Sequence, residues 1–124
     1  MKPETEEWMA RSEEHLSAAS VLLEQGLHRH CIFFCQQSLE MLLKAIWVEQ
    51  ASEGLPRRTH DLVALSKELD LDMSEEWLEF LRKLSEQYIP TRYGDVQVEY
   101  SGETAQNYEK GTKEISAWLR QRLS

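Results

Sequence analysis

The segment spanning residues 31–48 reads CIFFCQQSLEMLLKAIWV, and it constrains the fold more than any other part of the chain. It is apolar around nearly its whole circumference, which predicts a helix that is buried on most sides. Gln36 or Gln37, Glu40 and Lys44 interrupt it at helical spacing and therefore share one face. Charges in such a helix are either a structural ion pair or one wall of a cleft, and the residues alone leave both interpretations open.

Apolar residues recur at helical spacing through the rest of the chain as well. They predict a first helix over residues 5–25, a second over 27–50 that contains the apolar run, and a last one over 103–122. Gly26 is predicted to end the first helix. With two further helices in between, the sequence predicts an all-α fold: an up-and-down bundle of four to five helices forming a single domain, residues 1–124.

Polar residues and prolines set the limits of the two middle helices. Thr59 is predicted to cap the N-terminus of the third helix, with Asp61 in its first turn, where a carboxylate suits the helix dipole. Ser74 is predicted to cap the fourth helix and Pro90 to end it.

The connection before the last helix, YIPTRYGDVQVEYSG, is long for so small a protein. Its aromatic and β-branched residues favour an ordered loop folded over the bundle. The alternation of Val96, Val98 and Tyr100 favours a short extended stretch within it.

The charge balance limits the classes of partner. Lys and Arg number 14 and Asp and Glu 22, so the formal net charge is −8, which counts against broad attraction to nucleic acid or anionic membranes. The N-terminal MKPETEEW lacks the basic and apolar regions of a signal peptide. We therefore expect a soluble, cytoplasmic protein without a membrane partner.

The two cysteines, Cys31 and Cys35, share a helical face at a spacing that does not favour a mutual disulfide. We predict that both are reduced thiols facing the core. Together with His28 they form a set of three possible metal ligands, but a closed zinc site needs a fourth ligand and usually draws on separate segments. The sequence thus predicts neither a metal site nor a cofactor.

Three segments, LEMLLKA, THDL and RYGD, occur in an order and at separations that resemble the HEPN domain family, named for nucleotide binding in higher eukaryotes and prokaryotes. The resemblance covers essentially the whole chain. It implies a helical bundle that forms a homodimer and works beside a small nucleotidyltransferase, commonly in toxin–antitoxin pairs. Many members are metal-independent ribonucleases, in which an Arg and a His a few residues downstream form the active site.

Arg92 of RYGD matches the catalytic Arg of that pattern, but no histidine follows it in this chain. Metal-independent RNA cleavage needs groups that accept and return a proton near neutral pH, and His serves both roles best. The missing His favours a protein that is not an enzyme. His60 of THDL is a possible substitute if the fold brings it near Arg92, although a structural role at the start of the third helix is the simpler interpretation.

Three hypotheses follow. The first is a binding protein for a nucleotide or an RNA phosphate. The second is a ribonuclease of altered motif that uses Arg92 and His60, and the third is a purely structural dimerisation or interaction module.

Arg92 either binds the phosphate or pairs with Asp95 or a carboxylate of the second helix. Arg57 and Arg58 are a further basic pair, either near the site or simply solvated. The predicted ligand-binding residues are Glu40, Lys44, His60, Asp61, Arg92 and Tyr93.

Overall fold

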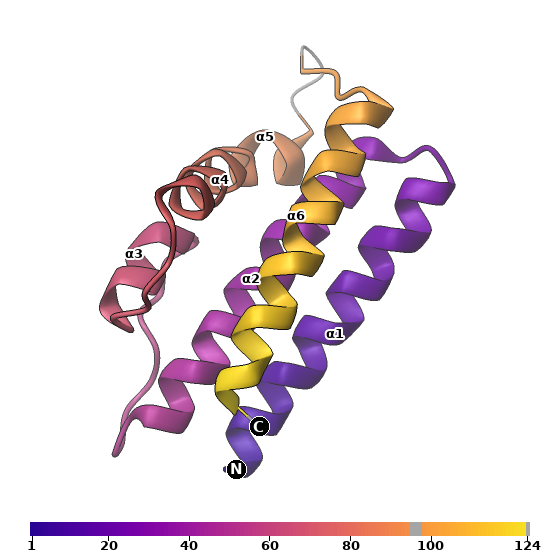
Figure 1. Ribbon diagram of the computed structural model, residues 1–124. Helices are drawn as coiled ribbons and strands as arrows, with labels where there is room; N and C mark the ends of the chain where they lie inside the picture. The colour runs from indigo at the N-terminus through magenta and orange to yellow at the C-terminus, as the bar shows by residue number, and fades with distance from the viewer. Residues whose placement is uncertain (95–97, 124) are drawn as a thin grey trace.

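A computed structural model describes residues 1–94 and 98–123 (Figure 1). All regular secondary structure in this described part of the chain is helical, which confirms the predicted all-α bundle of four to five helices, with one additional short helix. The elements are α1 (Pro3–Glu24), α2 (His28–Gln50), α3 (Leu62–Glu68), α4 (Glu75–Glu86), α5 (Tyr88–Tyr93), α6 (Gly102–Arg120) and a final 3₁₀ turn, η1 (Gln121–Leu123).

A tight turn reverses the chain between α1 and α2, so the two helices run antiparallel along their length (Figure 1). Gly26 has a left-handed φ of 75°, a conformation that glycine adopts without steric cost. The Gly26 amide donates to the Leu23 carbonyl and the Leu27 amide to the Leu22 carbonyl, at 3.0 and 2.9 Å. These bonds satisfy the last carbonyls of α1, so the prediction that Gly26 ends the first helix is confirmed.

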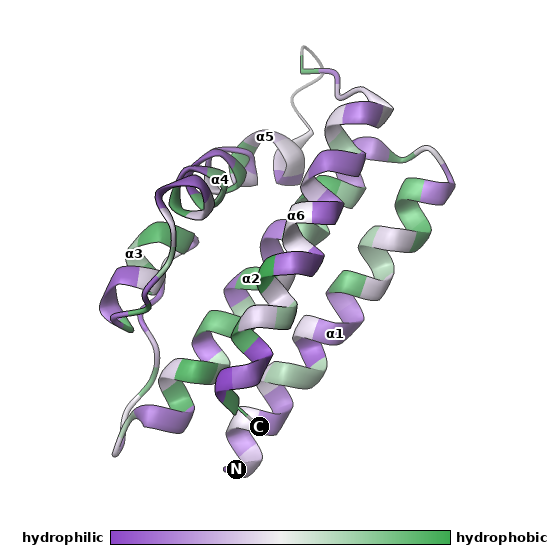
Figure 2. Ribbon diagram, viewed as in Figure 1, coloured by the Kyte–Doolittle hydropathy of each residue, from purple (hydrophilic) through white to green (hydrophobic). Residues whose placement is uncertain are grey.

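Helix α2 is the centre of the bundle. Most of its residues from Cys31 to Ile46 are buried, with α1 and α6 packed along it and α3, α4 and α5 covering the remaining side (Figure 1). Figure 2 shows hydrophobic residues, coloured green, recurring along α2 and along the helices around it. Helix α2 is also long and apolar enough to cross a membrane. However, 67% of the apolar stretch that meets this criterion is buried inside the protein, as in a core helix.

Helix α3 begins two residues later than predicted. Its N-cap is Asp61, whose Oδ1 accepts hydrogen bonds from the Val63 and Ala64 amides at 3.0 and 3.2 Å. The prediction that Thr59 caps this helix is therefore wrong, and Thr59 Oγ1 instead accepts from the Asp61 amide at 3.1 Å. Ser74 caps α4 as predicted, accepting from the Trp77 amide at 3.1 Å.

Pro90 does not end α4, contrary to prediction. Helix α4 ends at Glu86, and after Gln87 the chain re-enters a helix, α5, with Pro90 as its third residue. A proline in the first turn of a helix removes no hydrogen bond, because those amides have no partner within the helix. The segment predicted as a loop thus begins as a helix, which Gly94 closes with a left-handed φ of 67°.

The rest of that connection leads into α6. Val96 lies outside the described residues, so the predicted alternation is only partly in view, while Val98 and Tyr100 lie in non-helical chain. The Tyr100 hydroxyl donates to Gln87 Oε1 at 2.6 Å, which fastens this stretch to the α4–α5 junction.

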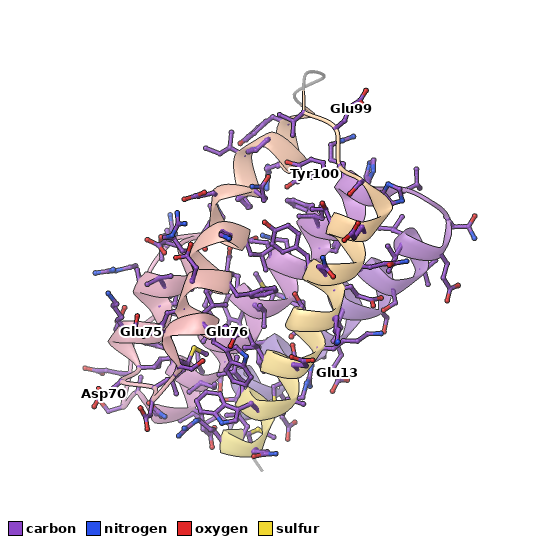
Figure 3. The ribbon with its side chains drawn as sticks, turned by 45° about the horizontal axis from the view of Figure 1, so that its top comes forward. Glu13, Asp70, Glu75, Glu76, Glu99 and Tyr100 are labelled. Atoms are coloured by element: carbon purple, nitrogen blue, oxygen red, sulfur yellow. The ribbon has the colours of Figure 1, made fainter. Side chains whose placement is uncertain are left out.

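Acidic side chains occupy several separate elements. Figure 3 labels carboxylates on α1, on the α3–α4 connection, on α4 and ahead of α6, namely Glu13, Asp70, Glu75, Glu76 and Glu99.

On α4, Arg82 Nη2 lies 2.5 Å from Glu79 Oε1, and Arg82 Nη1 pairs with Glu86. These three exposed residues are called the Arg82 cluster below.

Candidate functional site

The polar face of α2 is built around the carboxylate of Glu40, which is only 3% exposed. Lys44 Nζ lies 3.0 Å from its Oε2, while His60 Nδ1 and Gln36 Nε2 lie 2.7 and 3.2 Å from its Oε1. Gln36 also donates to the His60 carbonyl at 2.9 Å, which ties the start of α3 to α2. Gln36, Glu40, Lys44 and His60 together are called the Glu40 network.

This network answers the question that the sequence left open. Glu40 and Lys44 form a buried ion pair, and the same carboxylate also reaches His60 at the surface. A carboxylate removed from water needs several donors to replace its hydration, and the network supplies them. Lys44 has a side chain only 10% exposed, and its ammonium lies 5.9 Å from the centre of the Trp8 ring. Its geometry therefore matches a structural ion pair more than a ligand-binding lysine.

His60 lies at the outer end of the network, with half of its side chain exposed. Its ring stacks on Tyr88 of α5, with centroids 3.7 Å apart and planes inclined by 18°. Because Glu40 is bonded to Nδ1, the opposite ring nitrogen, Nε2, is left for other partners. Two contacts thus fix both the position and the orientation of the imidazole.

Arg92 contacts the same tyrosine. Its Nη1 donates to the Tyr88 hydroxyl at 2.8 Å, and its guanidinium carbon lies 5.8 Å from the centre of the Tyr88 ring. The structure therefore brings Arg92 and His60 together through Tyr88. The alternative partner of Arg92, Asp95, lies outside the described residues.

Tyr88 joins the two residues, yet the sequence prediction did not name it as a site residue. It is only 8% exposed, and in the sequence it is one of several aromatic residues of the connection before the last helix. The available signal was its position four residues before Arg92, which places the two side chains on one helical face.

Two other predicted site residues, Asp61 and Tyr93, are sequence neighbours of His60 and Arg92. Asp61 follows His60 directly and caps α3. Tyr93 is 72% exposed, with the Arg92 guanidinium carbon 5.6 Å from its ring centre. Arg57 does not join the site, because its Nε lies 3.8 Å from Glu68 of α3.

Both cysteines are buried and unpaired by disulfide, as predicted. A hydrogen bond between the two thiols lowers the pKa of Cys31 and raises that of Cys35. His28 has a different partner: its Nδ1 lies 3.0 Å from the carbonyl oxygen of Tyr100. Within residues 1–94 and 98–123 no group of three or more His, Cys, Asp or Glu side chains is arranged to hold a metal ion.

Comparison with known proteins identifies the fold. The crystal structure of TT1696 from Thermus thermophilus superposes with a TM-score of 0.85 at 24% identity, covering 98% of this chain and 99% of that one. The crystal structure of ST0689, an archaeal HEPN homologue, gives a TM-score of 0.78 at 25% identity, with 100% of both chains covered. A search of the curated proteins finds no match. The sequence model of the HEPN domain family matches residues 5–122, and the chain therefore belongs to that family.

Proposed function

We propose that this HEPN domain protein binds the phosphate of a nucleotide or of RNA beside His60 and Arg92. The observation that carries the proposal is the convergence of both side chains on Tyr88, at 3.7 Å between the rings and 2.8 Å to the hydroxyl. Arg92 is exposed, and the planar fork of a guanidinium suits a phosphate. Lys44 contributes indirectly, by holding Glu40 and through it His60.

Calorimetric titration of the full chain with ATP, AMP and inorganic phosphate tests the proposal. We expect Arg92→Ala to weaken binding of all three ligands. Arg120→Ala is the matched control, because it removes the same charge from the C-terminal end of α6, which lies at the opposite end of the bundle from α5 (Figure 1). The proposal fails if wild-type protein binds none of the three at millimolar concentration, or if both variants weaken binding equally.

One observation favours metal-independent RNA cleavage as a second candidate function. Glu40 holds His60 by Nδ1 at 2.7 Å, which is the arrangement of a base oriented by a carboxylate, with Nε2 directed to other partners. Incubating wild type, Arg92→Ala and His60→Gln with structured and unstructured RNA in the presence of EDTA tests it. Cleavage that both substitutions abolish supports the enzyme. Intact RNA in every reaction supports the binding protein.

We also propose a homodimer and a nucleotidyltransferase partner, as in toxin–antitoxin pairs. Two large apolar side chains of α5 are exposed, Ile89 at 65% and Tyr93 at 72%. Such groups near a site favour a protein interface. Light scattering at micromolar concentration should give the mass of two chains, and a monomeric mass would contradict the dimer. Copurification with the nucleotidyltransferase encoded by a neighbouring gene tests the partner.

A further inference from the structure

An open cavity of about 510 Å³ lies between the start of α3 and the α4–α5 junction. This volume is within the range of small-molecule sites. Val63, Tyr88 and Ile89 supply apolar walls, and the ring of His60 forms part of the same lining. The cavity therefore adjoins the residues proposed to bind a phosphate.

The His60 ring is a preorganised stacking surface. Tyr88 covers one face of the ring, and half of the side chain remains exposed. Glu40 and Tyr88 hold the ring in place, so a flat ligand would stack on it at little cost in side-chain entropy. Aromatic platforms of this kind are how proteins hold unstacked nucleobases.

The polar residues that line the cavity are Thr59, His60, Arg82, Ser85 and the two carboxylates Asp61 and Glu86. Asp61 uses Oδ1 to cap α3, and Oδ2 has no hydrogen-bond partner within the described residues. Glu86 accepts from Arg82 through Oε1, and no partner of its Oε2 is found in that part of the chain either. Ionised carboxylates accept hydrogen bonds and donate none. The two carboxylates of the lining therefore suit a ring whose edge presents N–H groups.

We infer that the cavity is a base subsite and that it binds guanine, an inference that rests on the proposed phosphate site. Guanine presents two adjacent donors, N1–H and the exocyclic N2 amino group, and the two lone pairs of Asp61 Oδ2 can accept both. Adenine places the N1 acceptor beside its amino group, and that lone pair is repelled by a carboxylate. Guanine stacked on the free face of His60 therefore donates to Asp61, and its phosphate extends toward Arg92.

Calorimetry of the full chain with GMP, AMP and ribose 5-phosphate tests this. We expect GMP to bind about tenfold more tightly than ribose 5-phosphate, within the range of stacking on an aromatic side chain, and more tightly than AMP. Ring protons of His60 should shift in NMR spectra on adding GMP and not on adding ribose 5-phosphate. Equal affinities for all three ligands overturn the guanine subsite and leave the phosphate site standing. Absence of any binding overturns both.

Asp61→Asn separates recognition from folding, because Asn caps a helix as well as Asp does. We expect this variant to lose the preference for GMP over AMP while its affinity for ribose 5-phosphate is unchanged or slightly higher. Asp72→Asn is the matched control, since it removes the same charge from an exposed position in the α3–α4 connection. A GMP preference that survives in Asp61→Asn, or disappears equally in Asp72→Asn, contradicts the assignment.

Free nucleotide and RNA both carry guanine 5′-phosphates, and a second titration distinguishes them. Short single-stranded RNA with one central guanine is compared with all-uridine RNA of the same length. Tighter binding of the guanine RNA than of GMP identifies RNA as the source. Tighter binding of GMP identifies the free nucleotide. The inference is overturned if the protein discriminates neither between the two RNAs nor between GMP and AMP.

Discussion

The Glu40 network and the Arg82 cluster contain the same kinds of charged group in opposite surroundings. Glu40 is 3% exposed and Lys44 10%, whereas Arg82 and Glu79 are 51% and 48% exposed. The network also joins two helices through His60, while the cluster lies within α4 alone. Short distances occur in both, so distance alone does not rank their importance.

Burial makes the difference between them. An exposed ion pair replaces good hydration by an interaction of similar strength, and its net contribution is small. A buried pair contributes little when intact, yet removing one partner leaves a charge without water or counter-ion. The Glu40 network should therefore be sensitive to single substitutions, and the Arg82 cluster tolerant of them.

The largest expected effect comes from Glu40→Gln. This change leaves the Lys44 ammonium buried without a counter-ion, and we expect a loss of about 3 kcal/mol in the free energy of unfolding. The same change in the exposed cluster, Glu79→Gln, should have a far smaller effect on unfolding. Urea unfolding followed by circular dichroism measures both. Equal losses in the two variants would show that burial does not separate the two groups.

A double substitution tests whether the loss comes from the unpaired charge. Glu40→Met combined with Lys44→Met replaces both charges by apolar groups of similar length. We expect stability within about 1 kcal/mol of wild type, because a buried pair can be exchanged for apolar packing at little cost. His60 is half exposed, so water can solvate Nδ1 in the variant. A double variant as unstable as Glu40→Gln would mean that the network stabilises the fold by its hydrogen bonds.

The helix caps next to the two charge groups allow a finer comparison. Asp61→Ala removes the cap of α3 beside His60, and Ser74→Ala removes the cap of α4, which carries the Arg82 cluster. Each should cost about 1 kcal/mol in urea unfolding. Only Asp61→Ala should also shift the His60 ring resonances in NMR spectra, because Asp61 is adjacent to the anchored ring. Comparable shifts in Ser74→Ala would indicate that both helices move together.

Periodicity predicted the helices and the polar face of α2, because both depend on local spacing. It could not choose the cap of α3, since Thr59 and Asp61 both have suitable side chains and the choice depends on backbone angles. Pro90 predicts the end of a helix when only the sequence is considered, but a proline is equally compatible with the first turn of a new helix.

The candidate site depended more on tertiary contacts. Glu40 and Lys44 are neighbours on one helix, and their pairing follows from sequence spacing. Glu40 lies on α2, His60 just before α3 and Tyr88 on α5. Glu40 contacts His60 across 20 residues of sequence, and His60 stacks on Tyr88. Family resemblance pointed to His60 and Arg92, but nothing in the sequence indicated that Tyr88 would connect them.

The smallest expected effect is the pH dependence of the Arg82 cluster. The hydrogen bond from Arg82 lowers the pKa of Glu79 below its ordinary value of 4.5. A carboxyl with a lowered pKa in the folded state contributes stability above its ordinary pKa and loses that contribution as the pH falls through the folded value. The small difference in unfolding free energy between wild type and Glu79→Gln should therefore shrink between about pH 5 and about pH 3. In an Arg82→Leu background the difference should depend on pH much less, because the main group that lowers the pKa of Glu79 is gone and only the weaker effect of Lys83 remains. A pH dependence that persists there undiminished would assign the effect to another group.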